Sequence, residues 1–118
     1  MEKPHAVEVQ RAEQASPDMG TAALTRLERI ARNLPATRMD LGKAEAPFGT
    51  VYLAWGRDPE MRWHGVWGLR GMARICGFGP SYTAKDVQQL MVDDAAAFYQ
   101  MADKRNMWDE GFWRAGHS

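Results

Sequence analysis

The chain has only one cysteine, Cys76, so no disulfide can form within it. A lone thiol is typical of the reducing interior of a cell, where structural disulfides are rare. No apolar run reaches the length that a membrane-spanning helix needs, and no hydrophobic stretch follows Met1 as it would in a signal peptide. We therefore expect a cytoplasmic protein that does not associate with membranes.

An excess of charge is also lacking, because 15 Lys and Arg residues are balanced by 15 Asp and Glu residues. Proteins that bind nucleic acid through phosphate contacts usually have a basic surface. The composition therefore argues against nucleic acid as a partner.

The spacings typical of metal sites, dinucleotide-binding loops and phosphate-binding loops are absent from the sequence. His64 is the only histidine away from the two ends of the chain, and the sequence establishes no catalytic geometry between it and Cys76. We interpret Cys76 as a packed thiol, and Asp93 and Asp94 as the water-facing side of a helix. We expect no enzyme activity, no cofactor and no metal.

Aromatic residues are missing from the first 47 positions and all lie between Phe48 and Trp113. Aromatic side chains bury a large apolar area, so the core is expected in this later region. Residues 1–17 are polar and contain two prolines, which predicts a flexible N-terminal tail. Residues 18–118 are long enough for a single domain with one modest core.

Two segments have the periodicity of helices. The first is predicted over residues 18–33 and ends before Pro35. Its apolar stripe consists of Leu24, Leu27, Ile30, Ala31 and Leu34. The second is predicted over residues 83–105, where Thr83 and Asp86 have the spacing of a helix-capping pair.

The middle of the chain is less regular. Residues 35–48 resemble a loop, and residues 50–55 are rich in β-branched and aromatic side chains, which favours a strand. Residues 59–68 fit either a helix that begins after Asp58 or a strand that pairs with residues 50–55, and we favour a helix there as well as over residues 69–76. We predict a mainly α fold, a small helical domain that leaves room for one short β-hairpin at about residues 50–67.

The densest aromatic stretch, residues 63–72, combines tryptophan with Gly65, Gly68 and Gly71. This composition favours a contact surface, since Trp often anchors interfaces and Met adapts its shape to a partner. The expected protein-binding residues are Trp63, Trp67, Leu69, Met72, Phe78, Trp108, Phe112 and Trp113. A second copy of a small protein commonly covers such a patch, so we also expect a homodimer.

Residues 82–92 resemble the first helix and turn of the excisionase-type and MerR-type helix-turn-helix. The resemblance implies a DNA-binding regulator that uses residues 82–105. Gln88 stands where that pattern has a small residue, and Met91 stands where it has the glycine of the turn. Without that glycine, residues 83–105 are better interpreted as one continuous helix.

Residues 61–70, together with the length and the Trp- and Met-rich centre of the chain, are similar to the QslA-type quorum-sensing anti-activators. This resemblance implies a non-enzymatic regulatory protein that binds the ligand-binding domain of a LuxR-type transcription activator. Binding would block dimerisation and DNA binding by the activator. Another small inhibitor protein, such as a phage-derived one, remains an alternative.

Overall fold

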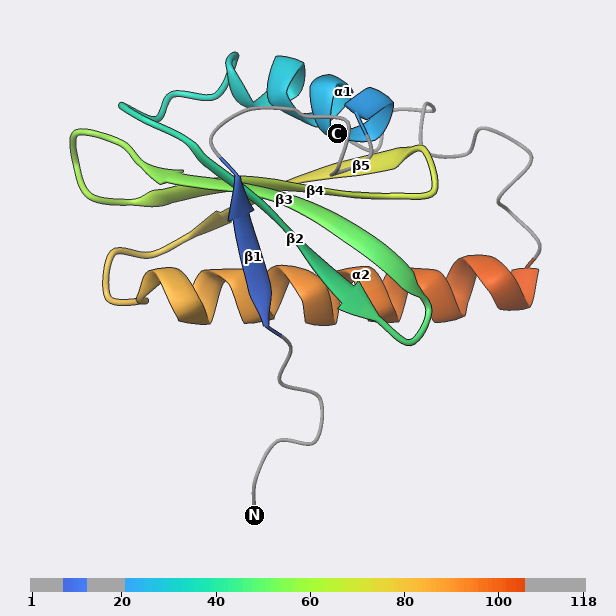
Figure 1. The fold of residues 1–118 in the computed structure, drawn as a ribbon. Helices are drawn as coiled ribbons and strands as arrows, with labels where there is room; N and C mark the ends of the chain where they lie inside the picture. The colour runs from blue at the N-terminus through green and yellow to red at the C-terminus, as the bar shows by residue number, and fades with distance from the viewer. Residues whose placement is uncertain (1–7, 13–20, 106–118) are drawn as a thin grey trace.

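The computed structural model describes residues 8–12 and 21–105. Within them a five-stranded sheet has one helix on each face (Figure 1). All neighbouring strands are antiparallel, and their order across the sheet follows their order in the chain. The elements are β1 (Val9–Ala12), α1 (Thr21–Ala31), β2 (Asp40–Ala46), β3 (Gly49–Arg57), β4 (Trp63–Leu69), β5 (Met72–Phe78) and α2 (Ala84–Arg105).

The prediction of a mainly α, helical domain is wrong, because the sheet is the central element of the fold. The expected helix over residues 69–76 is instead the turn between β4 and β5 and most of β5. Arg70 has φ 53° and Gly71 has φ 82°, the left-handed pair that defines a type I′ hairpin turn. Arginine rarely adopts this conformation, so the sequence does not signal the turn.

A β-hairpin does lie at residues 50–67, where β3 pairs with β4 from Tyr52–Gly68 to Arg57–Trp63. Two further strands were not predicted. Residues 40–46, expected to be a loop, form β2 although they lack β-branched side chains. Residues 9–12, within the expected tail, form β1 and pair with β2. Strand β1 pairs with a strand far along the chain, and β2 is held between β1 and β3, so local propensity does not reveal these two strands.

The two helices begin and end close to their predicted limits. In α1 the apolar stripe faces the sheet, with Leu24, Leu27 and Ala31 buried. At the start of α2 the Thr83 hydroxyl accepts a hydrogen bond from the Asp86 N–H at 3.1 Å, and the Asp86 carboxylate accepts one from the Thr83 N–H at 3.0 Å. This reciprocal pair is the predicted cap.

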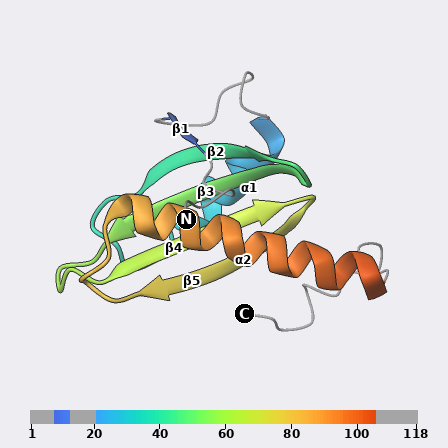
Figure 2. The same cartoon turned by 90° about the horizontal axis from the view of Figure 1, so that it is seen from below.

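A hydrophobic core lies on each face of the sheet. The smaller one packs α1 on β3 and β4, and the larger one packs α2 on the opposite face of the same strands. Figure 2 shows α2 crossing the sheet. Gly65 permits this approach, because a Cβ there would lie 2.8 Å from the Sδ of Met91. Both faces of β3 and β4 are therefore covered, and this explains their nearly continuous apolar sequences.

Candidate protein-binding surface

Four of the predicted anchors lie in the core. Trp67 is 0% exposed, Trp63 is 6% exposed, and Leu69 and Met72 are also buried. Phe78 is half-buried on β5. Trp108, Phe112 and Trp113 lie outside the described residues. The four buried side chains therefore have almost no exposed surface that a partner could contact.

Two of the buried tryptophans, Trp63 and Trp67, donate hydrogen bonds to polar groups that follow them in the chain. The Trp67 indole N–H donates to the Asp94 carboxylate of α2 at 2.8 Å, and the Trp63 indole N–H donates to the Tyr82 carbonyl at 2.8 Å. Asp94, expected to face water, therefore satisfies a buried donor. Both bonds attach α2 and the segment before it to the sheet.

Two exposed residues with large side chains lie on the β3–β4 loop and on the loop before α2, whose backbones meet at Arg57. Met61 is 53% exposed and Tyr82 is 42% exposed. The Phe78 and Tyr82 rings meet edge to face, with centroids 6.1 Å apart. We call Met61, Phe78 and Tyr82 the tip patch; of the predicted anchors it contains only Phe78.

Arg57 holds the two loops of the tip patch together. Its guanidinium donates to the carbonyls of Met61 at 2.7 Å, Pro80 at 3.2 Å and Tyr82 at 3.0 Å. It also lies 4.1 Å from the centre of the Trp63 ring, which adds a cation–π contact. A planar guanidinium can bind several acceptors at once, whereas a lysine cannot hold them in this geometry. The tip patch is therefore pre-organised.

Hydrogen bonds to the Asp58 side chain fix the conformation of the β3–β4 loop. Its carboxylate accepts hydrogen bonds from the backbone N–H groups of Glu60 at 2.8 Å and Arg62 at 2.9 Å. The His64 ring lies 2.8 Å from the other carboxylate oxygen. The hydrogen bond with His64, followed by the two backbone bonds, lowers the pKa of Asp58 from its usual value. The loop thereby presents Met61, whose φ is 70°.

His64 and Cys76 do not form a catalytic pair. Cys76 lies opposite Gly65 in the β4–β5 register, so its side chain shares the α2 face of the sheet, whereas His64 projects from the other face. Burial, and secondarily the charge of Asp94, raises the pKa of the Cys76 thiol to about 11. The thiol therefore stays protonated at neutral pH and is a poor nucleophile.

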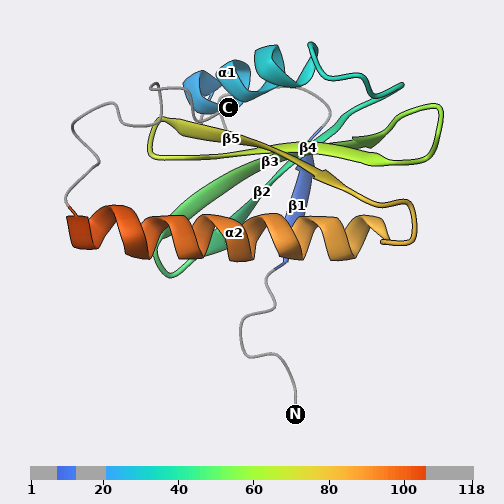
Figure 3. The same ribbon diagram turned by 180° about the vertical axis from the view of Figure 1, so that it is seen from behind.

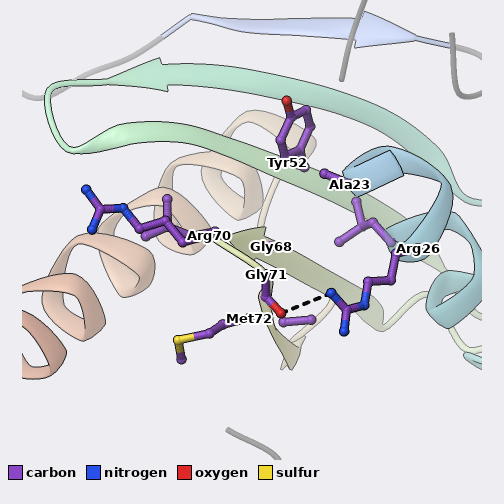
Figure 4. Close-up of a pocket in the computed structure, with 10 residues that line it drawn as sticks. Ala23, Arg26, Tyr52, Gly68, Arg70, Gly71 and Met72 are labelled. Carbon is purple, nitrogen blue, oxygen red and sulfur yellow. Dashed lines mark hydrogen bonds between the residues drawn. The ribbon is translucent and has the colours of Figure 1, made fainter. Parts of the chain in front are cut away.

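A hollow of about 240 Å³ lies beside the β4–β5 turn, between β4 and the first turns of α1 (Figure 4). At its rim the Arg26 guanidinium donates to the Gly71 carbonyl at 3.2 Å. The residues that line the hollow include no His, Cys, Asp or Glu. It is also smaller than most ligand pockets, so it gives no support for a catalytic site.

Two further observations concern the described part of the chain. It contains no cluster of three or more His, Cys, Asp or Glu residues that could hold a metal ion. It also contains no helix with the length and apolar character needed to cross a membrane.

The segment that resembles a helix-turn-helix does not have that form. Residues 84–105 are a single helix, as the missing turn glycine predicted. Met91, at the position of the expected turn, is fully buried and packs against Gly65. Residues 82–105 therefore do not supply a separate recognition helix.

Comparisons with known proteins identify no relative: no family model, curated protein or solved structure matches the chain. The resemblance to QslA-type anti-activators stays a prediction.

The sequence contains one signal that could have located the tip patch. Loops and turns are usually polar, yet Met61 and Tyr82 lie within two residues of prolines, in the segments 58–62 and 79–83. A large apolar side chain beside a turn-forming residue is expected to be exposed, and its exposure suggests a contact.

Proposed function

We propose that this protein is a non-enzymatic cytoplasmic regulatory protein that inhibits a LuxR-type transcription activator by binding its ligand-binding domain. Binding would block dimerisation of the activator and its binding to DNA. The identity of the partner rests on the resemblance of residues 61–70 to the anti-activators. The single cysteine supports a reducing compartment.

The tip patch is the observation that carries the proposal. Its three side chains are large and apolar, and Arg57 holds the loops that present them. Pre-organised aromatic side chains lose little conformational entropy on binding, and a few such residues usually provide most of the interface energy. Tyr82 and Met61 are therefore the expected anchors, in place of the buried tryptophans.

The proposal predicts that Tyr82→Ala weakens binding to a purified LuxR-type ligand-binding domain by about 30-fold, equivalent to about 2 kcal/mol for an interface anchor. Met61→Ala should also weaken binding, because Met61 is the most exposed side chain of the patch. Isothermal titration calorimetry measures both affinities. Tyr82 is 42% exposed, so removal of its ring should leave the fold intact, which circular dichroism checks.

Leu90→Ala is the matched control, because Leu90 is an exposed apolar residue of α2, outside the tip patch. It should bind the activator domain as the unaltered protein does. Absence of binding by the unaltered protein would contradict the choice of partner. Equal affinities for the unaltered protein and Tyr82→Ala would contradict the assignment of the patch.

A further inference from the structure

Strand β5 forms one edge of the sheet (Figure 3). Its register with β4 is continuous from Met72, opposite Leu69, to Phe78, opposite Trp63, and contains no bulge. The strand has no proline or lysine. Natural edge strands are usually protected by shortness, bulges, prolines or lysines. The opposite edge, β1, has only four residues, whereas β5 has seven, and the one charged side chain that β5 carries, Arg74, lies 3.6 Å from Asp94 of α2.

The turn determines which backbone groups of β5 face outward. In a two-residue hairpin the residues that flank the turn, Leu69 and Met72, form a hydrogen-bonded pair. Hydrogen-bonded and non-hydrogen-bonded pairs then alternate along an antiparallel ladder. Ala73, Ile75 and Gly77 are therefore in non-hydrogen-bonded pairs, and their N–H and C=O groups point away from β4.

Ile75, the middle residue of β5, is 51% exposed. It lies opposite Val66 and shares the face of the sheet on which α1 packs. The contacts of α1 with the sheet are mainly with β3 and β4. Among the described residues, the outer edge of β5 therefore combines unpaired backbone groups with a large uncovered aliphatic side chain.

We propose that β5 pairs in antiparallel fashion with β5 of a second copy of this chain, across a two-fold axis at Ile75. Ile75 would lie opposite Ile75 of the partner subunit, and Ala73 opposite Gly77 of the partner subunit. This register pairs every outward N–H with an outward C=O, because the two-fold axis passes through a residue whose groups face outward. The two sheets would join into one.

The side chains of β5 suit this register. The exposed isoleucine side chains would cover each other at the axis, and the small side chains would meet on either side of it. On the other face Arg74 would lie opposite Cys76 of the partner subunit, so no like charges stand directly opposite. Arg74 is also 3.6 Å from Asp94 of its own chain, and the chain has no net charge, which limits repulsion between copies.

Amide hydrogen exchange of the unaltered protein tests the pairing without any substitution. In a dilute sample the amides of Ala73, Ile75 and Gly77 should exchange rapidly, whereas those of Arg74 and Cys76, bonded to β4, should be protected. Raising the protein concentration should slow the exchange of the Ala73, Ile75 and Gly77 amides. Protection of these amides in a sample that sediments as a single chain would mean that another segment of the same chain covers the edge, and would overturn the proposal. Rapid exchange at all concentrations would overturn it as well.

Ile75→Lys provides a second test, because it places a charge at the two-fold axis while the side chain remains half-exposed. Sedimentation should give about twice the chain mass of 13.3 kDa for the unaltered protein and one chain mass for Ile75→Lys. Met61→Lys is the matched control, since Met61 is about equally exposed but lies outside β5, and this variant should remain dimeric.

A monomeric unaltered protein at millimolar concentration, or a dimeric and folded Ile75→Lys, would overturn the proposal. These outcomes do not depend on any activator domain, so failure here is distinguishable from failure of the proposed function.

Discussion

Two tryptophans that the sequence suggested as interface anchors lie in the core of the fold. Trp63 and Trp67 are buried, and each indole N–H has an acceptor at or beyond residue 82. Tryptophan dominates both cores and interfaces, because its large apolar area is useful in either place. The sequence identifies such residues but does not reveal that α2 covers the face of the sheet from which they project.

The long-range hydrogen bonds of polar side chains could not be predicted from the sequence either. Asp94 accepts a hydrogen bond from an indole 27 residues earlier, and Arg57 reaches carbonyls up to 25 residues later. The partners in these hydrogen bonds lie too far apart in the sequence to form a recognisable motif. By contrast, the pair of Thr83 and Asp86 was predictable, because its two members lie within one helical turn.

Cys76 gives a prediction at the scale of a single residue. Its pKa of about 11, against an ordinary value of 9.0, leaves roughly 100-fold less thiolate at pH 8. Iodoacetamide should therefore modify the native protein far more slowly than the protein unfolded in urea. The modification rate of the native protein, followed by mass spectrometry, should continue to rise above pH 9. A native rate equal to the unfolded rate at pH 8 would show that the thiol is not buried as described.

At the scale of elements, the helices were predictable and most of the strands were not. The stripe from Leu24 to Leu34 and the cap at Thr83 are signals within short windows of sequence. Strand β2 contains mostly small and charged residues, and it is extended because β1 and β3 pair with it on either side. The turn at Arg70 and Gly71 lacks the usual Asn-Gly signal, so the β4–β5 hairpin was interpreted as a helix.

The close packing of α2 on β4 predicts that a larger residue at position 65 destabilises the protein. In Gly65→Ala the new methyl group would lie 2.8 Å from the Met91 Sδ and 3.0 Å from the Ala54 carbonyl oxygen. Met91 is fully buried and has little room to move, so the substitution should lower the free energy of unfolding by about 1–3 kcal/mol. Urea denaturation followed by tryptophan fluorescence measures the change.

Gly77→Ala is the control for that measurement. It also adds a methyl group to a strand glycine, but the nearest atom is 3.8 Å away. Its effect should stay within about 0.5 kcal/mol. Equal stability of the two variants would mean that α2 does not approach β4 as closely as described.

At the scale of the whole molecule, the described residues leave two different surfaces for partners outside the core. The tip patch lies at the end of the sheet where the loops 58–62 and 79–83 meet, and the β5 edge runs along its side. A neutral domain with such surfaces can bind protein partners without a general attraction to nucleic acid. We propose that the first surface binds the activator and that the second binds another copy of the chain.

The most direct test of the proposed function is amide hydrogen exchange of the unaltered protein with and without a LuxR-type ligand-binding domain. We expect the domain to slow exchange in residues 58–62 and 79–83, the two loops of the tip patch. Residues of α1, on the opposite face of the sheet from α2, should exchange as before. A footprint confined to α1, or no footprint at a saturating concentration of the domain, would contradict the account.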